Sequence, residues 1–173
     1  MAAESSRPAG HCNLVKVGTL KLNDVNCDPW YTGAVCLPGH GVVLADNRGC
    51  IVKLHDLSTG ELLATSDRLP GPWDVCVLKA SQSKVAVSST NGEVRILTVR
   101  PNGHSTSIRL EKTIKTNLEI CFGVNAIKSR GKFFISGCYR GKLCWSAVSL
   151  SSYKPVGRIH EICEYDGYSF SYL

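Results

Sequence analysis

VVLADNRGCIVKLHDL, residues 42–57, joins two apolar runs through a tight polar turn that contains Gly49. The pattern returns as KVAVSSTNGEVRILTV (residues 84–99) and as KFFISGCYRGKLCWSAV (residues 132–148), with turn glycines Gly92 and Gly141. The three glycines are 43 and 49 residues apart, and propeller blades repeat every ~40–50 residues. This spacing predicts a β-propeller.

Each repeat contains four short apolar runs separated by turn residues. In the first repeat the runs are AVCL, VVLAD, CIVKLHDL and ELLATSDRL, and the segments PGHG, NRG and STG separate them. Such runs, bounded by Gly, Pro, Asn and Ser, are typical of antiparallel strands. We therefore expect an all-β partial propeller: a disordered tail over 1–10, an incomplete strand region at 11–27, three four-stranded blades over about 31–70, 72–116 and 121–162, and a final incomplete strand at 165–173.

The number of repeats raises a question of completeness. A closed propeller typically needs four to eight blades, and only three full repeats are recognisable. Three explanations remain open: the sequence is a piece of a longer protein, it is translated from a partial gene, or two copies associate through their open propeller edges to complete a ring.

Targeting signals and cysteine usage point to the cytoplasm. No apolar run approaches the ~20 residues of a membrane span, so we expect no membrane partner. The N-terminus MAAESSRPAG has no apolar segment typical of a secretory signal. There are nine cysteines, an odd number, and those in or beside apolar strands are expected to act as small hydrophobes: Cys36, Cys76, Cys121, Cys138 and Cys144.

Catalytic and metal-binding motifs are missing from the sequence. There is no GxSxG elbow, P-loop, HExxH or CxxC pair, and the pairs Cys36/His40 and His160/Cys163 are isolated. We therefore expect no enzyme activity, cofactor or metal. Asp46 and Asp74 are the candidates for acid–base chemistry, but both follow the pattern of Asp bonded to a neighbouring turn.

A calcium-dependent propeller hydrolase is a disfavoured alternative. Such a site would need oxygen ligands from several blades pointing into one channel. Asp46 is matched by Ser89 in the second repeat and by Gly137 or Cys138 in the third. The carboxylate does not repeat, so the sequence does not predict a ring of ligands.

The motif LADNRGCIVKLHD (residues 44–56) resembles the NHL repeat of TRIM-NHL (tripartite motif) proteins. Three further stretches are similar to those of invertebrate, notably molluscan, TRIM-like propeller proteins: WYTGAVCLPGHG (30–41), RLPGPWDVCVL (68–78) and EKTIKTNLEICFGV (111–124). The likeness covers about residues 28–150, although the Asn-His-Leu triplet itself is absent. It implies a non-catalytic module that recognises protein substrates. The RING, B-box and coiled coil have no counterpart in this chain, so we expect no ubiquitin-ligase activity from it.

The net charge of +6 is concentrated in the third repeat, where the last 73 residues carry ten Lys or Arg against five Asp or Glu. In an up-and-down blade, the loop before the first strand and the loop between the second and third strands emerge on one face. That face combines aromatic and basic residues, which suit protein partners or, alternatively, single-stranded RNA. The predicted binding residues are Trp30, Tyr31, Arg48, Trp73, Asn91, Phe122, Tyr139 and Arg140.

Overall fold

The computed structural model describes Thr19, Lys21, Leu22 and residues 28–79, 81, 83–102, 105–127 and 131–164 of the 173-residue chain. The tail expected over residues 1–10 and the strand expected over 165–173 lie outside the described residues. Most of the segment 11–27 lies outside them as well.

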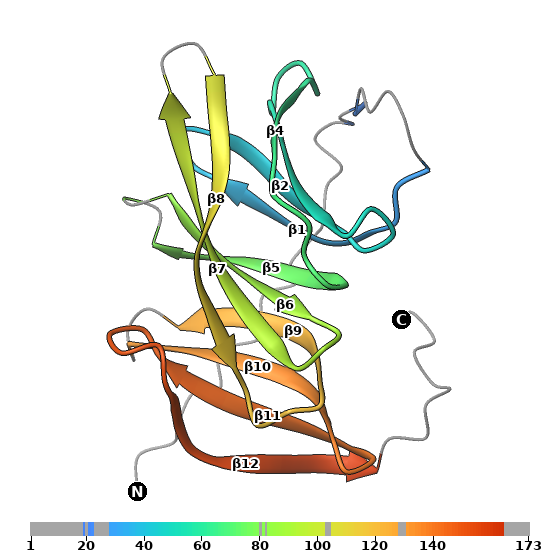
Figure 1. The fold of residues 1–173 in the computed structure, drawn as a ribbon, viewed down its shortest axis with the longest axis vertical. Coiled ribbons are helices and arrows are strands. Elements are labelled where there is room, and N and C mark those ends of the chain that lie inside the picture. The colour runs from blue at the N-terminus through green and yellow to red at the C-terminus, as the bar shows by residue number, and fades with distance from the viewer. Residues whose placement is uncertain are drawn as a thin grey trace, which may run out of the picture.

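Twelve strands form three four-stranded antiparallel sheets, each a meander in which neighbouring strands follow one another in the chain (Figure 1). The all-β expectation is confirmed, and the described residues contain no α-helix, so none that could cross a membrane. Blade 1 consists of β1 (Tyr31–Leu37), β2 (Gly41–Asp46), β3 (Ile51–His55) and β4 (Leu62–Thr65). Blade 2 consists of β5 (Pro72–Lys79), β6 (Lys84–Ser89), β7 (Glu93–Asn102) and β8 (Ser105–Lys115). Blade 3 consists of β9 (Ile120–Ile127), β10 (Lys132–Tyr139), β11 (Lys142–Ser149) and β12 (Pro155–Glu164).

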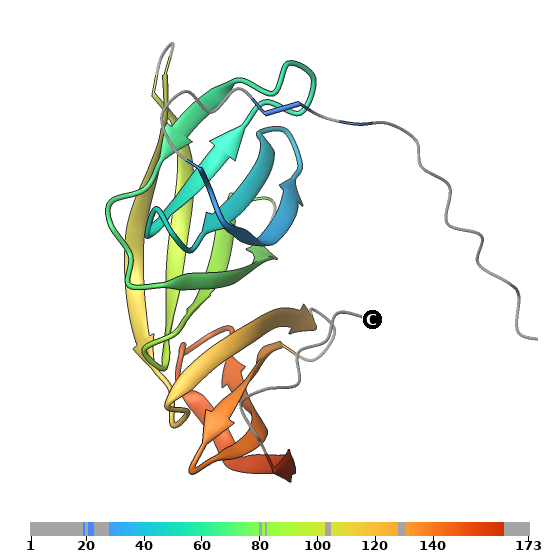
Figure 2. The same ribbon diagram turned by 90° about the vertical axis from the view of Figure 1, so that its right-hand side faces the viewer.

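The blades follow one another along the longest axis in both views, with blade 2 between the other two (Figures 1 and 2). Successive residues of a strand point to opposite faces of a sheet, and blade 2 uses both faces for its core. Leu97 and Val99 of β7 belong to the cluster shared with blade 1, whereas Val94 and Ile96 belong to the cluster shared with blade 3. The strand β7 therefore carries buried apolar residues on both of its faces, as is typical of strands covered on both sides.

The first strands of the three blades, β1, β5 and β9, also pack against one another, and we call them the inner strands. Gly33 shows how closely β1 and β5 approach: a Cβ atom at this position would lie 2.6 Å from the Cα atom of Asp74. No side chain larger than hydrogen fits there without moving the β5 backbone, so the inner strands of blades 1 and 2 depend on this glycine.

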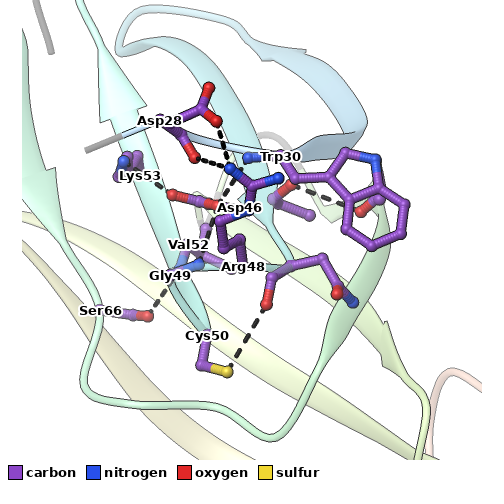
Figure 3. A network of polar contacts seen from close by, with 12 residues as sticks. Asp28, Trp30, Asp46, Arg48, Gly49, Cys50, Val52, Lys53 and Ser66 are labelled. Carbon is purple, nitrogen blue, oxygen red and sulfur yellow. Dashed lines mark hydrogen bonds and ion pairs between the residues drawn. The ribbon is translucent and has the colours of Figure 1, made fainter.

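A buried ion pair joins β2 to β3 in blade 1 (Figure 3). Lys53 Nζ lies 2.8 Å from Asp46 Oδ2, and both side chains are at most 2% exposed. The other carboxylate oxygen, Oδ1, accepts hydrogen bonds from the backbone N–H groups of Gly49 (3.0 Å) and Trp30 (3.2 Å). Burial raises the pKa of the Asp46 carboxyl, but the hydrogen bonds from Lys53, Gly49 and Trp30 together lower it below its ordinary 3.8.

The position that Lys53 holds in blade 1 is occupied by a different residue type in each blade. Lys53, Arg95 and Cys144 are each the third residue of the third strand of a blade, and all three are buried. Arg95 Nη1 donates to Ser89 Oγ at 2.7 Å, and Arg95 also pairs with Glu93. Blades 1 and 2 thus each hold a buried cation with a carboxylate partner at this position. Blade 3 holds the thiol of Cys144 there instead.

Four of the five cysteines expected to act as small hydrophobes are buried free thiols: Cys76, Cys121, Cys138 and Cys144. The expectation was wrong for Cys36, whose side chain is exposed although it lies in β1. Cys36 lies opposite Val42 of β2. The residues before and after it, Val35 and Leu37, point to the other face of the strand and pack against the core between blades 1 and 2.

Replacing Asp46 by Ala is expected to destabilise the fold by about 3–5 kcal/mol, because it leaves the Lys53 ammonium buried without its carboxylate partner. Denaturant unfolding would measure this loss. The double variant Asp46→Ala/Lys53→Met removes both charges and is expected to recover most of the stability. A single variant as stable as the wild type would contradict the role assigned to the ion pair.

The same pair predicts a pH dependence. A carboxyl whose pKa is lowered in the folded state stabilises the fold above its unfolded pKa, near 3.8, and this contribution is lost as pH falls through the lower folded value. Thermal unfolding followed from pH 6 to pH 2 should show a steeper loss of stability below pH 3.8 for the wild type than for Asp46→Ala/Lys53→Met. Parallel curves would contradict this prediction.

Thiol labelling should separate the cysteines by burial. Burial, with a smaller contribution from the Asp74 charge, raises the pKa of Cys76 to about 12, and burial raises that of Cys121 to about 11. The thiolate is the reactive form, so at pH 8 a maleimide should modify Cys36 in the folded protein and leave Cys76 and Cys121 unmodified. Mass spectrometry with and without denaturant would show it, and native labelling of Cys76 at the rate of Cys36 would contradict it.

Candidate functional site

The loops that precede the inner strands and the loops between second and third strands lie together on one side of the blades, which we call the ring face. Backbone hydrogen bonds join the two kinds of loop in blades 1 and 2, and in blade 3 they join the loop before β9 to the end of β10. Asn47 N–H donates to Trp30 O at 2.9 Å, and Thr90 N–H donates to Gly71 O at 3.0 Å. In blade 3, Glu119 N–H donates to Cys138 O at 2.8 Å. The antiparallel meander therefore brings these loops to the same face, as the sequence indicated.

Three aromatic side chains, one from each blade, form a continuous row on the ring face. Trp30 and Trp73 have ring centroids 5.8 Å apart with an edge-to-face orientation, and Trp73 and Phe122 repeat this arrangement at the same distance. Edge-to-face pairs at such distances are favourable. Trp30 is 46% exposed, and the other two rings are partly exposed. We call these three residues the aromatic row.

The strand pairing is irregular near the start of each inner strand, and in blades 2 and 3 this irregularity falls on the residue of the aromatic row, Trp73 or Phe122. The pairing shifts between Tyr31 and Gly33, between Pro72 and Val75, and at the point where Phe122 is passed over. A β-bulge leaves an extra residue unpaired and redirects its side chain. The register passes over Trp73 and Phe122, which explains why their rings contact each other across blades instead of continuing the alternation of their strands.

Asp74 connects blade 2 to blade 3 directly beneath the row. Its Oδ2 accepts a hydrogen bond from Val124 N–H at 3.0 Å, and its Oδ1 accepts one from Val75 N–H at 2.8 Å. Ser88 Oγ accepts from Asp74 N–H at 3.0 Å and donates to Phe122 O at 3.1 Å. The bulged backbone around both aromatic residues is therefore held by side chains of blade 2.

Blades 1 and 2 are connected at the corresponding place through a single carbonyl. Pro72 O accepts hydrogen bonds from Thr32 Oγ1 at 3.3 Å and from Asn47 Nδ2 at 3.1 Å. Pro72 is buried and immediately precedes Trp73. The backbone at Trp73 and Phe122 is thus fixed by polar contacts to the neighbouring blade, whereas the backbone of Trp30 is bonded to Asp46 and Asn47 of its own blade.

The other five predicted residues do not join the row. Arg48 binds the backbone and carboxylate of Asp28, and Asn91 Nδ2 donates to Glu93 Oε2 at 3.0 Å. The Tyr31 ring lies 5.4 Å from Lys53 Nζ. Tyr139 packs against the core between blades 2 and 3, and the exposed Arg140 guanidinium lies 5.1 Å from its ring. The structure therefore brings Trp30, Trp73 and Phe122 together and disperses the remaining residues around them.

The two candidate acid–base residues, Asp46 and Asp74, both have structural partners. Asp46 is paired with buried Lys53, and both oxygens of Asp74 accept backbone hydrogen bonds. Within the described part of the chain, no group of three His, Cys, Asp or Glu side chains lies close enough to hold a metal ion. Of the basic residues in the hairpin KSRGK, Lys128 and Arg130 lie outside the described residues.

Sequence reasoning did not find the connecting residues Thr32, Ser88 and Asp74 in these roles. Their partners are 40, 34 and 50 residues away, so no local spacing reveals them. One signal was available for Asp74: a carboxylate directly after an aromatic residue at the start of an inner strand has no counterpart in the other two blades.

No protein-family model and no curated protein matches the chain. Solved structures do match. Hydrazine synthase of Kuenenia stuttgartiensis shares 10% identity with a TM-score of 0.64, over 77% of this chain and 37% of that one. The β-propeller domain of Myceliophthora thermophila Cps50 (Swd1) shares 12% identity with a TM-score of 0.60, over 79% and 42%. The WD40 β-propeller domain of Doa1 shares 17% identity with a TM-score of 0.53, over 72% and 37%.

These likenesses confirm the β-propeller fold, and the three sheets are its blades. The chain spans less than half the length of each of these three structures. The narrower resemblance to TRIM-NHL proteins stays a prediction.

Replacing Asp74 by Ala is expected to cost about 1–3 kcal/mol of stability, because the buried Val124 N–H loses its acceptor. Hydrogen exchange at the Val124 amide should accelerate together with the loss of stability measured by denaturant unfolding. Asp67→Ala removes an exposed carboxylate and serves as the control, with an expected change below about 0.5 kcal/mol. Equal effects of the two substitutions would contradict the role of Asp74.

Proposed function

We propose that this chain is a non-catalytic recognition module that binds protein partners on its ring face. The observation that carries the proposal is the aromatic row. Trp30, Trp73 and Phe122 are partly exposed, and Trp73 contacts both other rings across the blades. Asp74 and Ser88 hold the backbone at Trp73 and Phe122. Large aromatic side chains on a rigid support are the residues that contribute most to protein interfaces.

Fixing the rings in advance favours binding. A side chain that is already held in one position loses less conformational entropy when a partner docks. In this face the backbone on both sides of Trp73 is fixed, at Pro72 by Thr32 and Asn47 and at Asp74 by Ser88. An apolar side chain of a partner could therefore insert beside Trp73 without reorganising the blades.

The charges around the row favour a protein over a nucleic acid. Arg48 is paired with Asp28, and Asn91 is bonded to Glu93, so carboxylates lie on the same face as the basic residues. Carboxylates repel phosphate groups but do not disfavour a polypeptide with mixed charges. In a TRIM-like context, such a module would select protein substrates for a ligase domain elsewhere in the polypeptide, and it would work in the cytoplasm.

Single-stranded RNA is the second candidate ligand, favoured by the exposed Arg140 beside the aromatic residues of the ring face. Bases stack on aromatic rings, and arginines contact phosphates. An affinity that falls steeply with salt would indicate this mode. If Arg48→Glu/Arg140→Glu abolished binding of an RNA oligonucleotide while Trp30→Ala left peptide binding unchanged, the RNA interpretation would replace the protein one.

Peptides selected by display against the immobilised chain provide the main test. Trp30→Ala or Trp73→Ala is expected to weaken the best selected peptide at least tenfold, because truncation of a central aromatic residue typically costs more than 1 kcal/mol. The control is Leu57→Ala, which removes an exposed apolar side chain in the loop after β3, on the opposite side of blade 1. Peptides whose affinity depends on Leu57 and not on Trp30 or Trp73 would move the binding site off the ring face.

A further inference from the structure

The sheet of blade 3 carries a cluster of rings on the face that points away from blade 2. Phe133 of β10 and Cys144 of β11 are buried in the cluster shared with blade 2, so the residues next to them, Phe134 and Trp145, point to the opposite face. We call it the outer face of blade 3. The ring centroids of Phe134 and Trp145 are 5.4 Å apart, and the Trp145 ring is stacked on His160 at 4.0 Å with an angle of 6° between the planes.

A hollow of about 290 Å³ lies on this face beside Trp145. Its walls combine two aromatic rings with a carboxylate, an amide, a hydroxyl and a glycine: Phe134, Trp145, Asp74, Asn125, Ser136 and Gly123. Pockets that bind small molecules typically measure ~300–1,000 Å³. The hollow lies at the small end of this range, so its size suits one extended side chain better than a nucleotide or a large cofactor.

Gly123 of β9 keeps the hollow open. A Cβ atom at this position would lie 2.6 Å from Ser136 Oγ and 3.9 Å from Asp74 Oδ2. The carboxylate of blade 2 therefore approaches the hollow across the space that a side chain at Gly123 would fill. In blade 2 the residue directly after the aromatic residue of the row is Asp74, which bonds to the next blade at Val124. Blade 3 has glycine at that place and leaves the space free for a ligand.

Asp74 supplies the hollow with a negative charge that can accept further hydrogen bonds. Its Oδ1 accepts from Val75 N–H at 2.8 Å and its Oδ2 from Val124 N–H at 3.0 Å, whereas an ionised carboxylate has about four acceptor sites. Among the described residues, no Lys or Arg forms an ion pair with Asp74. Charges more than about 8 Å away are largely screened at physiological salt, so this carboxylate favours a cation despite the net charge of +6.

The aromatic walls suit a cation as well. A cation is attracted to the face of a tryptophan ring when it lies within about 6 Å of the ring centroid. His160 of β12 covers one face of the Trp145 ring, and the hollow lies on the other side, toward β10 and β9. Ser136 lies opposite Trp145 in the register of the sheet, and Asn125 lies opposite Phe134. Two further oxygen acceptors thus adjoin the two rings.

We propose that this hollow binds an arginine side chain of the protein partner, with the guanidinium between the Asp74 carboxylate and the Trp145 ring. The inference rests on the proposed function for the nature of the partner. A guanidinium is planar, stays charged and has five N–H donors, which matches one carboxylate, two further acceptors and two rings. Because Asp74 directly follows Trp73 in the chain, one polypeptide can place an apolar side chain on the aromatic row and an arginine in the hollow.

A small probe tests the hollow without any partner. The full chain is titrated with Nα-acetyl-arginine methylamide, and binding is followed by NMR at the indole N–H of Trp145 and the amides of Gly123 and Val124. The uncharged isostere Nα-acetyl-citrulline methylamide is expected to bind about tenfold more weakly, because it lacks the charge that the carboxylate and the ring attract. Equal binding of the two probes would overturn the proposal, as would an arginine probe that leaves these signals unchanged.

Two variants separate the carboxylate from the ring. Asp74→Asn removes the charge but keeps an oxygen that can accept from Val124 N–H, and it is expected to weaken the arginine probe about tenfold. Asp67→Asn removes an exposed carboxylate outside the hollow and should leave the affinity unchanged. Trp145→Leu leaves Asp74 and its backbone bonds in place, and its expected effect is about threefold. If Asp74→Asn does not fold, Trp145→Leu decides, and wild-type affinity in that variant would overturn the proposal.

This inference and the proposed function can fail separately. Selected peptides that ignore Trp30 and Trp73, together with an arginine probe that depends on Asp74 and Trp145, would overturn the binding role of the aromatic row alone. Peptides that depend on Trp73, together with an arginine probe that does not distinguish Asp74→Asn from Asp67→Asn, would overturn the arginine site alone.

Discussion

Packing of blade 2 against another blade on each of its two faces is the constraint on which this structure depends. Blade 2 must be apolar on its two faces at once, and β7 meets this with Val94 and Ile96 on one side and Leu97 and Val99 on the other. A charged residue in such a strand is excluded from water and needs a partner. Lys53 forms an ion pair with Asp46, and Arg95 donates to Ser89 and forms an ion pair with Glu93.

The same packing creates the candidate site. Stacked blades bring their inner strands side by side, and in blades 2 and 3 the irregular start of the inner strand turns an aromatic residue toward the ring face. Polar side chains then lock these irregular segments to the neighbouring blade, Asp74 at Val124 and Asn47 at Pro72. The aromatic row is therefore positioned by the packing of the blades and not by the loops alone. Such rigidity is what a recognition surface requires.

The sequence allowed the architecture to be predicted, because repeat spacing, turn glycines and apolar runs are local signals. The gathering of Trp30, Trp73 and Phe122 followed from the order of strands in a meander. The contacts that hold them did not follow, since Asp74 and Val124 meet only after two blades have stacked. Lys53 was equally hidden: within CIVKLHD it alternates with apolar residues as an exposed strand residue would, yet it is buried. Cys36 shows the converse, an apolar residue type on the exposed side of an inner strand.

At the irregularly paired residues near the start of the inner strands, the side chain that reaches the ring face is separate from the side chains that pack between blades. Elsewhere in these strands, residues such as Val75 and Val124 pack in the clusters between blades, so a change of side chain there alters folding. The register of the sheet passes over Trp73 and Phe122, and their replacement leaves the alternation of the strand intact. The ring-face residues of blades 2 and 3 can thus be replaced without altering the packed faces of their strands. The specificity of the ring face can therefore change while the packing of the blades stays the same.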